Sequence, residues 1–206
     1  MKNQNRRAGS LLLTLALLLG LCSPMGGLAP EAKAADTPKP AAPVLDDFLV
    51  PVSQAAQVPS GYTGIFTVDE LTAISDAPNV DYILMADLDL SGLEWTSLCR
   101  DDDAPFTGTF DGNGHVISGL TGTNGLFYYT DGAVIQNLGL KQVTIQSAQT
   151  SDDAAGGLIA TLLGDTEIRN CYVQGDLSSD TRYLGGIVGR RLGNGIGLTV
   201  ENCWMA

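Results

Sequence analysis

Apolar and polar positions alternate over much of the chain after residue 80, as they do in β-strands with one buried face. The alternation predicts strands over residues 82–90, 106–110 and 115–120, with turn residues at 111–114 between the last two. From residue 115 to the end no helical period is visible, so the pattern predicts an all-β fold. The first strand would bury four apolar side chains on one face: Leu84, Ala86, Leu88 and Leu90.

One short helix is predicted ahead of these strands. Thr67 and Glu70 have the spacing of a capping box, in which each side chain bonds the other residue's backbone N–H. Leu71 and Ile74 continue one apolar face, and the Pro-Asn pair that follows ends the helix. The sequence therefore predicts a helix over 68–75.

Internal repetition is the clearest organising signal in the second half of the chain. Three segments begin with a glycine and two apolar residues, at Gly125, Gly157 and Gly186. After each, an apolar residue precedes an asparagine by two positions, and the asparagines recur at nearly equal intervals. A period of about 32 residues that is carried by strands predicts a β-solenoid. The asparagines are Asn137, Asn170 and Asn202.

The repeat gives these asparagines and the residues after them structural roles. The alternation of apolar and polar positions breaks at each asparagine, which predicts a left-handed backbone conformation there. Stacked coils would then place the asparagine side chains in a ladder with a spacing of about 4.8 Å. The next residue is Leu138 in the first copy, then Cys171 and Cys203. We expect both cysteines to be small core side chains in adjacent coils. A strained disulfide between them stays an alternative, and Cys99 makes the number of thiols after residue 34 odd.

The chain before the predicted helix differs in composition from the rest. Residues 1–34 combine a basic start, an apolar run at 11–21 and small residues around Lys33, which predicts a secretory signal peptide. The apolar run is shorter than the roughly 20 residues of a membrane span, so no permanent span is expected. Residues 35–61 carry five prolines and predict an extended linker. The repeat domain is then expected over 62–206.

Charge excludes one class of partner. The chain has 11 basic and 23 acidic residues, a formal charge of −12. Without residues 1–34, 7 basic and 22 acidic residues remain, so the charge is −15. A nucleic-acid partner is not expected, because its phosphates need a basic surface. The 25 glycines have no three-residue period, which excludes collagen and indicates many turns.

The side chains offer little for catalysis, and we expect no catalytic residue, no metal ligand and no cofactor. His115 is the only histidine, so neither an H-E-x-x-H zinc site nor a Ser-His-Asp triad is expected. Asp87 and Asp89 share a face of a predicted strand, and Asp111 and residues 101–103 could lie near them. Such carboxylates could bind calcium or act on glycans. Because Asp87 and Asp89 alternate with leucines that are expected to be buried, we expect both carboxylates to be exposed and non-catalytic.

One ordered set of motifs resembles a known family. The run FTGTFDGNGHVISGL at 106–120, Gly-Leu-Phe at 125–127 and Ile-Gln-Asn-Leu at 135–138 are similar to the GLUG-motif repeat proteins. The resemblance covers about residues 62–206 and implies a right-handed parallel β-helix on exported bacterial proteins. It also implies a relation to the region that precedes the catalytic part of IgA-specific metallopeptidases. Only the copy at Gly186 keeps the closing glycine of the motif.

These observations predict a secreted or cell-surface repeat module for binding, adhesion or spacing, without catalysis of its own. Its partner would be an extracellular protein or glycan. Two alternatives stay open: the non-catalytic N-terminal region of a metallopeptidase, and a glycan-active β-helix enzyme. Because only Trp204, Met205 and Ala206 follow the third copy's Asn-Cys pair, we also expect an incomplete repeat domain and end-to-end association through the uncapped last coil.

Overall fold

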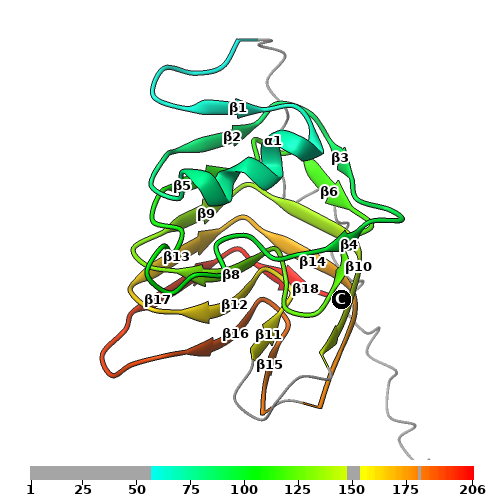
Figure 1. Cartoon of the computed structure of the whole chain (residues 1–206), viewed down its shortest axis with the longest axis vertical. Helices are drawn as coiled ribbons and strands as arrows, with labels where there is room; N and C mark the ends of the chain where they lie inside the picture. Colours follow the sequence, from blue (N-terminus) through cyan, green and yellow to red (C-terminus); the bar gives the residue numbers. More distant parts are fainter. Residues whose placement is uncertain (1–56, 148–153, 181) are drawn as a thin grey trace, which may run out of the picture. The chain divides into compact units, whose positions relative to one another are not determined.

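The computed structural model describes residues 57–147, 154–180 and 182–206, which belong to one compact unit, Ala42–Ala206. The expected signal peptide and most of the expected linker lie outside the described residues. The described chain is nearly all β and forms a parallel β-solenoid of about four turns with one short helix near its start (Figure 1). The predicted all-β parallel β-helix is confirmed.

Every strand pair is parallel, because each turn of the chain adds one strand to the same side of the solenoid. The first sheet has the order β1-β2-β5-β9-β13-β17. Its strands are β1 (Thr63–Ile65), β2 (Tyr82–Leu84), β5 (Thr109–Asp111), β9 (Val134–Gln136), β13 (Thr166–Arg169) and β17 (Leu198–Glu201).

The second sheet contains the longest strands. Its order is β18-β14-β10-β6-β3, and β7 pairs with both β10 and β4. Its strands are β3 (Leu88–Asp89), β4 (Glu94–Trp95), β6 (Val116–Ser118), β7 (Thr121–Gly122), β10 (Gly139–Ser147), β14 (Tyr172–Ser179) and β18 (Trp204–Met205). Two smaller sheets complete the turns: β8 (Phe127–Thr130), β12 (Ile159–Leu162) and β16 (Val188–Arg191) in one, β11 (Ala154–Gly156) and β15 (Tyr183–Gly185) in the other.

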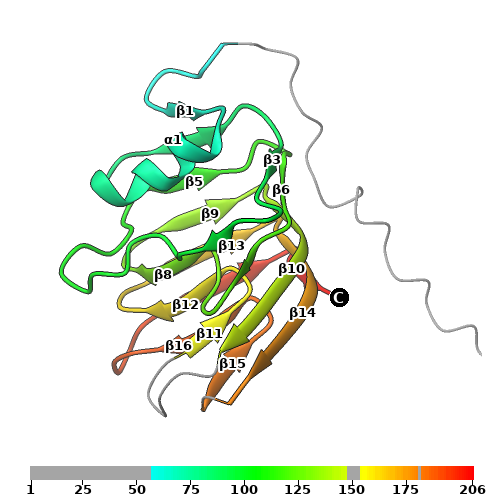
Figure 2. The same ribbon diagram turned by 45° about the vertical axis from the view of Figure 1, so that its right-hand side comes forward.

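The helix α1 (Val68–Thr72) continues into the 3-10 turn η2 (Ala73–Asp76), close to the predicted range. The predicted capping box is present: Glu70 N–H donates to Thr67 Oγ1 at 3.3 Å, and Thr67 N–H donates to Glu70 Oε2 at 3.0 Å. Figure 2 shows α1 on the side of the solenoid where β8, β12 and β16 follow in later turns. The helix thus replaces a strand on the first turn.

The core consists of columns of side chains that repeat from turn to turn. Ile135 lies between Phe110 and Ile168 in the register of the first sheet, and all three are fully buried. Phe127 packs on Phe106 with ring centroids 4.8 Å apart. The other buried columns are Ile117, Leu140 and Val173; Phe127 and Ile159; and Leu138 and Cys171.

Two strand predictions are wrong in extent. The predicted strand over 82–90 is two strands, β2 and β3, separated by a bend at 85–87. Here the chain turns from the first sheet into the second, and buried leucines on both sides of the corner imitate one continuous alternation. In the predicted strand over 106–110, only residues 109 and 110 lie in β5, while Phe106 forms an isolated bridge with Thr130.

Candidate functional site

The outer face of the second sheet carries columns of polar side chains. Thr121 pairs with Glu94 on one side and Thr144 on the other, and Thr144 pairs with Asp176. The alternation of the strands turns these residues outward, because Ile145, next to Thr144, is fully buried in the core. Four turns of the solenoid thus contribute to one polar column.

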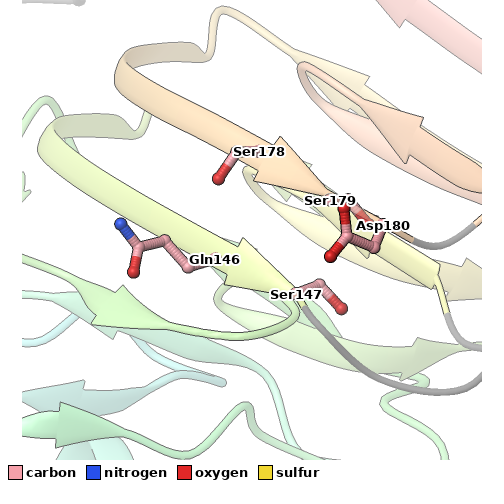
Figure 3. A pocket seen from close by; sticks show the side chains of 5 residues that line it. All are labelled: Gln146, Ser147, Ser178, Ser179 and Asp180. Carbon is pink, nitrogen blue, oxygen red and sulfur yellow. The ribbon is translucent and has the colours of Figure 1, made fainter.

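Two shallow depressions on this face meet at Gln146. The first, of about 230 Å³, lies at the ends of β10 and β14, where Gln146 and Ser178 project side by side from paired positions (Figure 3). The second, of about 220 Å³, lies over β4 and β7. We call their combined surface the Gln146 trough. Its residues are Glu94, Thr121, Gly122, Thr123, Gln146, Ser147, Ser178, Ser179 and Asp180.

The trough offers hydroxyl, amide and carboxylate groups and no lysine or arginine among its lining residues. Ser178 Oγ donates to the Ile145 carbonyl at 3.4 Å, which fixes its side chain. Ser147 is 3% exposed, and its Oγ has no hydrogen-bond partner among the residues that the structure describes. Such groups can bond the hydroxyls of a neutral ligand, whereas Glu94 and Asp180 would repel an anionic one.

The three repeat asparagines form a side-chain amide ladder on the first sheet. Asn170 Nδ2 donates to Asn137 Oδ1 at 3.0 Å, and Asn202 Nδ2 donates to Asn170 Oδ1 at 3.2 Å. Their φ angles of 53°, 51° and 52° confirm the predicted left-handed bend. Asp111, which sequence reasoning did not place here, begins the ladder by accepting from Asn137 Nδ2 at 3.1 Å.

The two carboxylates of the predicted strand, Asp87 and Asp89, accept hydrogen bonds from backbone N–H groups. Asp87 lies in the bend outside any strand, and its Oδ1 contacts His115 Nδ1 at 3.0 Å and accepts from Val116 N–H at 2.9 Å. Asp89 accepts from Ser91, and this bonding lowers the pKa of the Asp89 carboxyl. The exposed carboxylates of residues 101–103 lie within 4.8 Å of one another on a turn. The structure therefore does not bring Asp87, Asp111 and 101–103 into one acidic site around a groove.

The repeat glycines lie where backbones approach closely. Gly125 has a φ of +121°, and a Cβ there would collide with the carbonyl oxygen of Gly156. A Cβ on Gly157 would meet the Gly186 carbonyl oxygen and lie 2.6 Å from a Val173 methyl. These glycines therefore allow successive turns to pack at the corner just before β8 and β12.

The three described cysteines, Cys99, Cys171 and Cys203, are free thiols in different environments. Cys99 is buried at a left-handed backbone position (φ 53°), and burial raises its pKa to about 11. Cys171 is fully buried, as expected for a core side chain, whereas Cys203 is only half-buried because it lies in the last turn.

The last turn exposes apolar side chains. Val200 continues the column of Ile135 and Ile168 but is 45% exposed, since β17 ends its sheet. The other exposed apolar side chains of this turn are Tyr183, Leu184, Leu192 and Met205. Among the residues that the structure describes, no helix is long and apolar enough to span a membrane.

Comparisons with known proteins agree with the architecture. No family model matches the chain. The chain is 35% identical to halomucin of Haloquadratum walsbyi in an alignment of 132 positions, which covers 56% of this chain and only 1% of halomucin. The crystal structure of a candidate immunoglobulin A1 protease from Bacteroides ovatus matches with a TM-score of 0.50 and 21% identity, over 73% of this chain and 58% of that chain. This similarity shows a shared β-solenoid fold.

Proposed function

We propose that this chain is an exported surface repeat module that binds a neutral, hydroxyl-rich ligand, an extracellular glycan above all, in the Gln146 trough. The observation that carries the proposal is that two depressions sharing Gln146 lie along four parallel strands, β4, β7, β10 and β14. An elongated chain of sugars presents hydroxyls at regular intervals, and strands stacked about 4.8 Å apart present partners at regular intervals too.

Export and domain organisation form part of the same proposal. The signal-peptide pattern of residues 1–34 and the proline-rich composition of 35–61 support a secreted or cell-surface protein whose repeat domain covers 62–206. The similarity to halomucin supports a repeat module of a larger protein. The motifs at 106–138 support membership of the GLUG-type repeats.

A glycan array with the purified chain tests the binding function. We expect binding to neutral glycans and not to sulfated or uronic-acid polymers. Gln146→Ala should weaken binding about 2- to 10-fold, because a ligand hydrogen bond contributes about 0.5–1.5 kcal/mol. Gln174→Ala is the matched control, since Gln174 lies on β14 but does not line the trough. Equal affinity of both variants, or no glycan bound, would contradict the proposal.

The first alternative is the non-catalytic region of a metallopeptidase. The fold shared with a candidate immunoglobulin A1 protease favours it. The coding sequence downstream of residue 206 tests this alternative. An H-E-x-x-H motif there would support the peptidase. Further repeats or a wall anchor would support the surface module.

The second alternative is a glycan-active enzyme, for which Glu94 and Asp180 are the carboxylates of the trough. Release of sugars from a bound glycan, abolished by Glu94→Gln or Asp180→Asn, would establish this activity. For the binding module we expect binding without any release.

The exposed apolar turn supports one more proposal, association of two copies through their last coils. Pairing of the free edges of β17 would cover Val200 and its neighbours. Sedimentation over a concentration series should show a dimer that Val200→Lys dissociates. A wild-type monomer at every concentration would refute this association.

A further inference from the structure

Cys171 and Cys203 occupy the same level of two adjacent turns. The pair Arg169 and Glu201 precedes them in register, and Tyr172 and Trp204 follow them. Trp204 N–H donates to the Cys171 carbonyl at 3.1 Å, which fixes this level of the stack. Neighbouring strands bring Cα atoms to about 4.8 Å, within the range of roughly 4.4–6.8 Å that disulfides span.

The two side chains also point the same way. Cys171 Sγ lies 3.7 Å from the Ile135 carbonyl oxygen, and Cys203 Sγ lies 3.5 Å from the equivalent Ile168 carbonyl oxygen. Each thiol thus lies over the preceding turn, on the same side of its strand. The sulfurs are therefore neighbours in one column.

The two thiols differ in pKa and in exposure to solvent. The neighbouring Cys171 thiol lowers the pKa of Cys203, while burial raises the pKa of Cys171. Cys203 is half-buried and Cys171 is 1% exposed. A reagent in solution reaches Cys203 first, and Cys203 is also the better source of thiolate.

We propose that Cys171 and Cys203 are a redox-active thiol pair that reacts with small disulfides and closes into a disulfide joining the last two turns. The Cys203 thiolate attacks one sulfur of the small disulfide, forms a mixed disulfide and releases one thiolate. The Cys171 thiol loses its proton and attacks Cys203 Sγ, which releases the second thiolate. The protein loses two electrons and two protons, and the small disulfide becomes two thiols.

The disulfide would link the last turn of the solenoid covalently to the turn before it. The strands β14, β15, β16 and β17 lie between the two cysteines in the chain, so the disulfide closes a loop of one full turn of the solenoid. The same turn carries the exposed Leu192 and Val200 and is held by strands on one side only. Oxidation is therefore expected to suppress local opening of this turn.

The experiment treats the full chain carrying Cys22→Ser, which has three thiols, with bis(2-hydroxyethyl) disulfide at pH 7.5. We expect the thiol count to fall from three to one, a mass decrease of two hydrogens, and one disulfide-linked peptide that contains Cys171 and Cys203. Limited proteolysis within 192–197 should become at least about tenfold slower, because the disulfide reduces the fraction of molecules in which the last turn is locally open.

Single variants distinguish the steps. Cys171→Ala should stop at a stable mixed disulfide on Cys203, whereas Cys203→Ala should keep both remaining thiols. Cys99→Ala is the control and should still close the disulfide, because Cys99 lies in another part of the core. Three thiols that persist in the folded parent chain, or a disulfide that includes Cys99, would overturn the proposal.

Discussion

The amide ladder allows a quantitative test at Asn170, its central member. The side chain donates to Asn137 and accepts from Asn202, and its backbone has a φ of 51°. Asn170→Ala removes two hydrogen bonds, each contributing about 1 kcal/mol net. It also places alanine in the left-handed region, at a cost of about 1–2 kcal/mol. We therefore expect the free energy of unfolding to fall by about 3–4 kcal/mol.

Two companion variants separate these contributions. Asn170→Gly removes the same hydrogen bonds without backbone strain and adds about 0.7 kcal/mol of unfolded-chain entropy, so its loss should be about 2.7 kcal/mol. Asn202→Gly removes one ladder bond at an exposed position and carries the same entropy term, so it should cost about 1.7 kcal/mol.

Urea unfolding followed by circular dichroism measures all three values. The reasoning would be refuted if Asn170→Gly were as damaging as Asn170→Ala, since backbone strain would then have no part. A loss for Asn202→Gly equal to that for Asn170→Gly would likewise show that the bonds do not act as a ladder.

Three further predictions use the backbone and the helix cap. Gly125→Ala should destabilise the fold by several kcal/mol more than Gly132→Ala in thermal unfolding, because a Cβ at Gly125 meets the Gly156 carbonyl whereas one at Gly132 meets open space; equal losses would contradict the close packing. Gln142→Gly should raise the free energy of unfolding in urea by about 0.3–1.3 kcal/mol, because relief of the left-handed strain at φ 53° exceeds the entropy that glycine adds to the unfolded chain; no gain would show that the strain is absorbed elsewhere. Hydrogen bonds from the backbone of Phe66 and Thr67 lower the pKa of Glu70, so the contribution of this carboxylate to folding stability is complete above pH 4.5 and is lost as pH falls through the lowered pKa. Glu70→Gln should remove this part of the acid dependence of the free energy of unfolding, and an unchanged acid dependence would refute the role of the cap.

Features decided by neighbouring residues could be predicted from the sequence. The capping box of α1 depends on Thr67 and Glu70, three positions apart, and it forms as expected. The left-handed bends at the repeat asparagines depend on the local tolerance of asparagine for positive φ. The regular recurrence of these asparagines indicated the solenoid, because stacked turns must repeat their core residues at the same positions.

The ladder shows where this local reasoning stops. Asp111 begins the ladder, yet it lies before the longer turn of Gly112, Asn113 and Gly114, so its sequence context differs from that of Asn137. Only the pairing of β5 with β9, which sets Asp111 opposite Gln136, brings its carboxylate to the amide of Asn137.

The Gln146 trough depended still more on the tertiary structure. Each of its residues, from Glu94 to Asp180, is in sequence an ordinary polar residue of a strand or a turn. The sequence alone determined that the chain repeats, that it bends at the repeat asparagines and that the apolar residues of the repeat fill the core, because these follow from short-range periodicity. It did not show the bend at 85–87, where buried leucines on both sides continue the alternation. The tertiary structure decided which polar residues share one surface, because stacking joins residues that lie a full turn of the solenoid apart in the chain, and it aligned the two cysteines of the last turns in the same way.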